Sequence, residues 1–329
     1  MRFISREKLA GLLEGQGKGR TVIAPRLAGE VPLYGKIKRA EDIVWEFGRP
    51  LLSAKEFLFP RTERLFFVAA DGERISMQET LPEEEVVVFG VRPCDSRGIK
   101  ALDEVFLEAP VDPYYRRRRE NTTLIGVTCA EMGPTCFCRS VGGDPDDLSG
   151  VDVGLTAVPD GYAIRTTTDK GEALLAGLVF TEFDGELARP GLNDPVPLPD
   201  DMVWAPRFAD GRWEQIAERC LSCRLCAYVC PTCRCFDIRD EAVTASNGGS
   251  RWERLRCWDG CTGEAYRKIA GGHNPRQDPG QRLRNRFYCK FHYFPARYGQ
   301  VACTGCGRCI DVCPVGIDVT EVLAQLAVG

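Results

Sequence analysis

The stretch Cys220-Leu-Ser-Cys223-Arg-Leu-Cys226-Ala-Tyr-Val-Cys230-Pro231 determines how the C-terminal part of this chain is interpreted, because it occurs twice. The second copy is Cys303-Thr-Gly-Cys306-Gly-Arg-Cys309-Ile-Asp-Val-Cys313-Pro314, offset by 83 residues at every cysteine. Both copies have the form C-x2-C-x2-C-x3-C-P, which is the run that binds 4Fe–4S clusters in bacterial ferredoxins. Three thiols at this spacing let a tight loop wrap one cluster, and the fourth cysteine of each copy binds the cluster of the other copy.

We therefore expect two 4Fe–4S clusters with crossed ligation. The predicted ligands are Cys220, Cys223, Cys226 and Cys313 for cluster A, and Cys303, Cys306, Cys309 and Cys230 for cluster B. Gly305 and Gly307 would let the second loop approach its cluster closely, because glycine has no side chain. Zinc is the alternative metal, but zinc sites use single sets of four ligands rather than two overlapping sets that end in proline.

The 72 residues between Cys230 and Cys303 also bear on the fold class. An insertion of this length does not fit the compact bacterial ferredoxin fold, and its sequence has mostly helical patterns. We therefore expect an α-helical ferredoxin-like C-terminal domain with two 4Fe–4S clusters, closed by a helix over Val319–Ala327.

The N-terminal half predicts an α/β domain. Short apolar runs predict buried strands, and helical segments lie around them in a βαβ-like rhythm. The expected strands are Leu65–Ala70, Val86–Val91 and Leu124–Val127, with a hairpin over Val151–Thr168, and the expected helices are Arg6–Glu14, Ile99–Phe106 and Glu172–Phe180. The segment Arg189–Pro199 holds four prolines and predicts a linker. The expected division is 1–188 for the α/β domain, 189–212 for the linker and 213–329 for the cluster domain.

Nine further cysteines lie outside the repeated motifs. Cys94 and Cys129 each follow a predicted strand, and Cys136 and Cys138 come shortly afterwards, so these four could meet around one metal centre. We hypothesise a third iron–sulfur cluster there, and the alternative is that they are buried thiols. The remaining five are Cys233, Cys235, Cys257, Cys261 and Cys289. Three roles stay open for this second group: further cluster ligands, structural thiols, or the ligands of a zinc site.

Composition limits the class of protein. A net charge of −4 argues against a dominant nucleic-acid surface, and no apolar stretch predicts a membrane span or an export signal. We therefore expect a cytoplasmic protein. Seventeen cysteines in such a chain indicate metal ligands or redox groups rather than disulfides. The run Gly15–Gly19 is not a dinucleotide or phosphate-binding motif, so we expect no flavin or NAD in this chain.

Several segments together resemble one family, the β (iron–sulfur) subunits of cytoplasmic hydrogenase/sulfur reductase (sulfhydrogenase) complexes. They are Val88–Asp95, Asp112–Tyr115, Cys136–Cys138, Cys230–Cys235, Gly271–Asn274, Arg284–Arg286 and the closing ferredoxin motif. The iron–sulfur subunit of anaerobic sulfite reductase is similar in the N-terminal domain and the paired clusters.

The resemblance implies an electron-transfer subunit of an anaerobic oxidoreductase complex rather than an enzyme that is catalytic alone. Such a subunit relays single electrons between a flavin subunit that handles NAD(P)H and a catalytic subunit such as a hydrogenase. Sulfite reductase, formate and heterodisulfide complexes are alternative contexts. Three other functions stay open: an enzyme with a substrate-binding cluster in its N-terminal domain, a zinc-binding structural or nucleic-acid module, and a free ferredoxin-like carrier.

Overall fold

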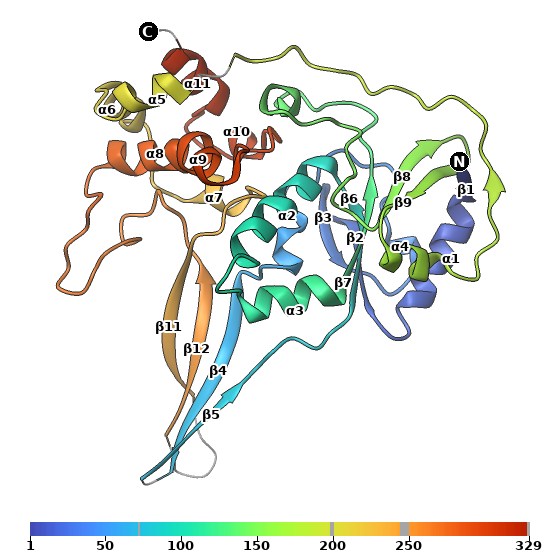
Figure 1. Ribbon diagram of the computed structural model, residues 1–329, viewed down its shortest axis with the longest axis horizontal. Helices are drawn as coiled ribbons and strands as arrows, with labels where there is room; N and C mark the ends of the chain where they lie inside the picture. The colour runs from blue at the N-terminus through green and yellow to red at the C-terminus, as the bar shows by residue number, and fades with distance from the viewer. Residues whose placement is uncertain (72, 198–200, 244–249, 328–329) are drawn as a thin grey trace.

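The N-terminal half of the chain builds an eight-stranded mixed sheet in a computed structural model that describes residues 1–71, 73–197, 201–243 and 250–327 (Figure 1). The strand order is β10-β1-β9-β8-β7-β6-β2-β3. These strands are β1 (Arg2–Ser5), β2 (Thr21–Ala28), β3 (Val31–Lys36), β6 (Val86–Val91), β7 (Thr122–Val127), β8 (Val153–Val158), β9 (Gly161–Thr166) and β10 (Thr181–Glu182). The neighbours β2, β6, β7 and β8 run parallel, and the strands outside them pair antiparallel.

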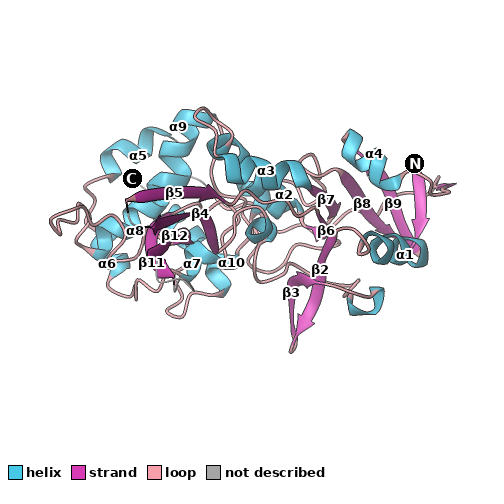
Figure 2. Cartoon of the chain, turned by 90° about the horizontal axis from the view of Figure 1, so that it is seen from below, coloured by secondary structure: helices cyan, strands magenta, loops and turns pink. Residues whose placement is uncertain are grey.

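Helices cover both faces of this sheet, as Figure 2 shows. They are α1 (Arg6–Gln16), α2 (Pro93–Phe106), α3 (Pro113–Asn121) and α4 (Asp169–Leu175). Alternate strand residues point to opposite faces. Val87 of β6 therefore packs in one core with α1 and α4, whereas Val88 packs in another core with α2 and α3. The predicted α/β layering is confirmed, including the helix over Ile99–Phe106 and the hairpin of β8 and β9. The helix expected over Glu172–Phe180 begins earlier and ends at Leu175.

A second, four-stranded antiparallel sheet has the order β11-β12-β4-β5. Its strands are β4 (Thr62–Asp71), β5 (Arg74–Glu79), β11 (Phe236–Val243) and β12 (Ser250–Trp258), and they form an arm that extends away from the larger sheet (Figure 1). The run Leu65–Ala70 is a strand, as predicted. However, it belongs to this arm and is only partly buried, so it is not a buried strand of the α/β sheet.

The arm also corrects the prediction of an α-helical fold for the C-terminal part. Residues 236–243 and 250–258 lie inside the long insertion between the two cysteine motifs, and they pair as antiparallel strands. Phe236 and Ile238 alternate with charged residues at a period of two, which indicates a strand rather than a helix. Because β12 pairs with β4, this sheet joins segments from both halves of the chain. The domain boundaries given above stay a prediction.

The rest of the described C-terminal part is mainly helical. Its helices are α5 (Asp201–Arg207), α6 (Arg212–Ala217), α7 (Leu225–Tyr228), α8 (Pro279–Tyr288), α9 (Phe294–Tyr298), α10 (Arg308–Asp311) and α11 (Val319–Ala327), with a π-helical turn over Cys289–Tyr293. Their core includes Trp204, Trp213 and Phe287, and Phe137 and Val141 of the N-terminal half pack into it. The closing helix over Val319–Ala327 is confirmed. None of the described helices combines the length and apolar character needed to cross a bilayer.

Residues 189–197 of the predicted linker form no helix, and only an isolated bridge pairs Glu131 with Gly191. Residues 198–200 of the linker lie outside the described residues. The helix α5 begins within the predicted linker.

A buried ion pair fastens the second cysteine motif to the larger sheet. Arg308, in α10, donates to both carboxylate oxygens of Asp95, in α2, at 2.8 and 2.9 Å. Both side chains have no solvent exposure. The Arg308 Nε also donates to the backbone oxygen of Pro50 at 2.8 Å, so the guanidinium is held on two sides.

We predict that Asp95→Ala destabilises the protein by about 3–5 kcal/mol, because removing one partner of a buried pair leaves the other charge without compensation. The measurement is anaerobic urea unfolding. The matched control is Glu108→Ala, which breaks the exposed pair between Arg297 and Glu108 and should shift the midpoint little. Equal shifts in the two variants would contradict a special role for the buried pair.

Candidate iron–sulfur sites

The two cysteine motifs adopt the same backbone conformation as well as the same sequence pattern. Ser222 and Arg224 of the first copy have φ angles of 53° and 67°, and the equivalent Gly305 and Gly307 of the second copy have 62° and 72°. These left-handed angles are rare for residues with side chains, so their recurrence at matching positions marks a shared loop fold. Backbone N–H groups approach the thiols, since Gly305 N donates to Cys303 Sγ at 3.5 Å and Ile317 N donates to Cys313 Sγ at 3.2 Å.

The four residues predicted to bind cluster A line one cavity of about 50 Å³. They are Cys220, Cys223 and Cys226 of the first copy and Cys313 of the second copy. Cys226 lies in α7, and Cys313 follows α10, which packs against α7. The last cysteine of the second motif is therefore placed beside the first three of the other motif, as crossed ligation requires.

The four residues predicted to bind cluster B also lie close together. Burial, opposed by Lys290 and reinforced by the nearby Cys230 and Cys306, raises the pKa of Cys303 to about 11. Burial likewise raises the pKa of Cys309 to about 12, with contributions from Cys306, Cys230 and Cys303. Cys230 thus stands within electrostatic reach of the second motif. Without metal, the thiols of Cys303 and Cys309 are therefore uncharged at neutral pH, whereas a hydrogen bond with Cys233 lowers the pKa of Cys230. Binding a metal would release the protons of the uncharged thiols.

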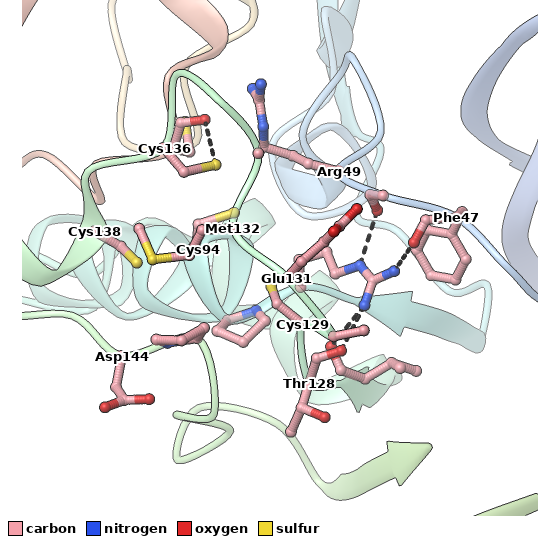
Figure 3. A pocket seen from close by; sticks show the side chains of 18 of the residues that line it. Phe47, Arg49, Cys94, Thr128, Cys129, Glu131, Met132, Cys136, Cys138 and Asp144 are labelled. Carbon is pink, nitrogen blue, oxygen red and sulfur yellow. Dashed lines mark hydrogen bonds between the residues drawn. The ribbon is translucent and has the colours of Figure 1, made fainter. Parts of the chain in front are cut away.

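The four N-terminal cysteines line a second, larger cavity of about 600 Å³ (Figure 3). They are Cys94, Cys129, Cys136 and Cys138. Cys94 lies in the first turn of α2 and Cys129 follows β7. Because β6 and β7 run parallel, the segments that leave them begin at the same edge of the sheet. The prediction that strand ends bring these cysteines together agrees with this geometry, and their role as ligands stays a prediction.

The loop that carries Cys136 and Cys138 packs directly on the second motif. Phe137 N donates to Gly305 O at 2.7 Å, and the Cys136 thiol donates to Cys306 O at 3.7 Å. Cys306 also lines the larger cavity. A Cβ atom at Gly305 would lie 2.5 Å from the Cys138 Cα, and one at Gly307 would lie 2.3 Å from the Thr135 oxygen. Both glycines are therefore required by this close approach as well as by their φ angles.

Buried cations surround the thiols. Lys290 Nζ donates to Cys230 Sγ at 3.2 Å and to the Thr232 hydroxyl at 2.7 Å. Arg286 donates to Cys233 Sγ at 3.6 Å and to the backbone oxygen of Cys226 at 2.9 Å. Lys55 donates to the Cys233 backbone oxygen at 2.9 Å and lies over the Trp258 ring.

These three cations form no ion pair with a carboxylate in the part of the chain that the structure describes. All three are buried. A buried charge without a counter-charge is costly, so the site is built for an anion. Iron–sulfur clusters bound by four thiolates carry net negative charge and therefore fit the surroundings of these cysteines.

Sequence reasoning did not place these cations beside the thiols. Arg308 lies inside the second motif and Arg286 in a segment that resembles the family, but Lys55 and Lys290 have no spacing that distinguishes them from surface residues. The sequence also did not predict that the arm formed by β4, β5, β11 and β12 would place residues next to the first cysteine motif.

Among the described residues, no group of three or more histidine, cysteine, aspartate or glutamate side chains is arranged to hold a single metal ion. The doubled motif with its overlapping sets of four cysteines, rather than this placement, favours clusters over zinc.

Comparison with known proteins agrees with this class. A family model described as a 4Fe–4S dicluster domain matches residues 219–317, which span both motifs. The chain is accordingly an iron–sulfur protein of the electron-transfer type.

The particular family follows from a relative of similar length. The chain is 33% identical over 317 residues to sulfhydrogenase 2 subunit beta of Pyrococcus furiosus, and the match covers 90% of this chain and 89% of the relative. The chain therefore belongs to the sulfhydrogenase β-subunit family, as the resemblance in its sequence predicted. No solved structure matches it.

We predict that Gly305→Ala displaces the loop carrying Cys136 and Cys138, because the added Cβ meets backbone atoms that cannot move aside locally. The displaced loop carries two predicted ligands of the third cluster, so the variant should lose that cluster, about four irons per chain, while cluster A remains. Iron analysis and low-temperature EPR of anaerobically purified protein measure both effects.

The matched control is Gly299→Ala. Gly299 has a φ of 70°, but a Cβ added there would meet no atom of the described residues within 4 Å, so this change carries only the backbone cost. Equal iron contents in Gly305→Ala and Gly299→Ala would contradict the prediction. The packing of the Cys136–Cys138 loop on the second motif would then not be needed to hold a cluster.

Proposed function

We propose that this chain binds two 4Fe–4S clusters through the crossed cysteine sets and a third cluster through the N-terminal set, and that it relays single electrons inside an anaerobic oxidoreductase complex. Cluster A uses Cys220, Cys223, Cys226 and Cys313; cluster B uses Cys303, Cys306, Cys309 and Cys230; the third uses Cys94, Cys129, Cys136 and Cys138. When bound, such clusters accept and release one electron at a time.

The observation that carries this proposal is the continuity of the three cysteine sets. Cys309 lines the cavity of the first set, although it belongs to the second. Cys306, also of the second set, touches Cys136 of the third. Neighbouring sets therefore meet directly, and such an arrangement suits electron transfer better than three isolated structural sites would.

The surrounding residues supply what charged clusters need. Lys290 donates to a cluster B thiol, and Arg308 lies 3.7 Å from Cys94 Sγ of the third set. Fixed positive charge and hydrogen bonds to the sulfurs raise the reduction potential of a cluster. Solvent exposure of the cluster also changes this potential. Cys230 and Cys306 are buried, so protein rather than water surrounds much of cluster B.

The partners follow from the family. A subunit named beta works with other subunits, and the relative is a component of a sulfhydrogenase. We infer one partner that handles NAD(P)H through a flavin and another that is catalytic, of the hydrogenase/sulfur reductase type. This similarity favours such partners over those of a sulfite reductase, formate or heterodisulfide complex. The cytoplasm is the compartment we expect.

Crossed ligation is tested by Cys313→Ala. Cys313 lies in the second motif but lines the cavity of the first, so we predict that the variant loses cluster A. Its EPR spectrum should match that of Cys220→Ala, which removes a ligand of the same predicted set. A spectrum that matches Cys306→Ala instead would show that each motif binds its own cluster.

The third cluster is tested by the double variant Cys129→Ser/Cys138→Ser. We predict a loss of about four irons and four acid-labile sulfides per chain relative to the native protein, with the signals of clusters A and B retained. Cys257→Ser provides the control for substitution of a cysteine outside every predicted set. Unchanged iron content in the double variant would remove the third cluster from the account.

A further inference from the structure

Three of the remaining cysteines come together where the arm meets the first motif. Cys233 and Cys235 lie between that motif and β11, and Cys261 follows β12. The hairpin register pairs Phe236 with Trp258, so the chain segments just outside the hairpin are neighbours. The Asp259 N–H donates to Cys235 O at 3.0 Å and extends this pairing by one further bond.

The thiols themselves are in contact. Cys261 is hydrogen-bonded to Cys235, and the Tyr266 hydroxyl is hydrogen-bonded to the same Cys235 sulfur. Cys261 also stands within electrostatic reach of Cys233. Cys261 is buried, and the other two are partly buried. These contacts join residues that are distant in the sequence, and nothing in the two ferredoxin motifs requires them.

Positive charge is concentrated on this cluster of thiols. Arg286 donates to Cys233 Sγ, and Lys55 donates to Cys233 O. Lys55 lies within reach of the charges of Cys233 and Cys235 as well as of Cys230. Its ammonium group is buried and forms no carboxylate pair among the described residues. An anion centred on Cys233, Cys235 and Cys261 would provide the missing counter-charge.

We propose that Cys233, Cys235 and Cys261 bind a further iron–sulfur cluster, with a non-cysteine group in the remaining ligand position. The Tyr266 hydroxyl and the Arg286 guanidinium would donate hydrogen bonds to the ligating sulfurs. Structural thiols and a zinc site are the competing interpretations.

The location of this site beside cluster B follows from one contact. The Cys233 thiol is hydrogen-bonded to Cys230, which is a predicted ligand of cluster B. The third set meets the same cluster through another ligand, Cys306. Cluster B would therefore have three neighbours: the further site at Cys230, the third cluster at Cys306, and cluster A.

The test compares Cys235→Ser/Cys261→Ser with Cys257→Ser in the full chain, purified anaerobically with its partners. Cys257 lies nearby in β12, where it pairs with Asp237 and Thr62, and it lies outside the proposed set. Iron, zinc and acid-labile sulfide are measured per chain, with EPR of clusters A and B as the check on folding. We expect the double variant to lose about two to four irons with matching sulfide, and Cys257→Ser to lose none.

Two results would overturn the proposal. Unchanged metal content in the double variant would make the three residues structural thiols, and loss of zinc in place of iron would make the site a zinc site. A second measurement does not depend on the Cys235→Ser/Cys261→Ser variant. The Cys129→Ser/Cys138→Ser variant lacks the third set, and after separation from its partners it should still contain more iron than the roughly eight atoms that clusters A and B supply; eight or fewer would contradict the further site. Failure of the relay proposal has a different signature, because the native protein would then lack the signals of clusters A and B.

Discussion

The pairing of Arg308 with Asp95 is the interaction on which the arrangement of the cysteines depends. Arg308 stands between Cys306 and Cys309 of the second motif, and Asp95 follows Cys94 at the start of α2. The pair is fully buried, and it joins a loop from the end of the chain to the edge of the N-terminal sheet. Buried pairs of this kind contribute little net stability but are costly to break, so they specify position more than they add free energy. Gly305 and Gly307 act in the same direction, because only residues without a Cβ let the loop of Cys136 and Cys138 pack against the motif.

Charge balance then links folding to metal binding. Lys55, Arg286 and Lys290 are buried beside thiols and have no carboxylate partners among the described residues. Burial raises the pKa of Cys303 to about 11, so this thiol is uncharged in the metal-free protein, whereas a hydrogen bond with Cys233 lowers the pKa of Cys230. Complete sets of cluster-bound thiolates supply more negative charge to the cations than the free thiols do, so we infer that cluster insertion completes the fold of this region rather than filling a finished site.

The sequence predicted the parts of the fold that rest on local periodicity and on repeated spacing. Strands β6 and β7, helix α11 and the hairpin of β8 and β9 follow from their apolar patterns, and the grouping of Cys313 with the first motif follows from the ferredoxin spacing. The β11–β12 hairpin was missed because its two-residue alternation of polar and apolar residues lies in an insertion whose other patterns are helical. The contacts of Lys290, Arg308 and Cys261 could not be predicted, because they join residues far apart in the chain and carry no pattern of their own. The grouping of Cys233, Cys235 and Cys261 depends on the register of that same hairpin.

The central claim is that the cysteine sets hold clusters close enough to act as one relay. EPR of the fully reduced native protein tests it most directly, because neighbouring paramagnetic clusters broaden and split each other's signals. The account predicts a spin-coupled spectrum that integrates to about three or more spins per chain and does not change when the protein is diluted. Narrow, uncoupled signals would show that the clusters are isolated from one another, and the absence of any reducible signal would show that the cysteines do not bind iron–sulfur clusters.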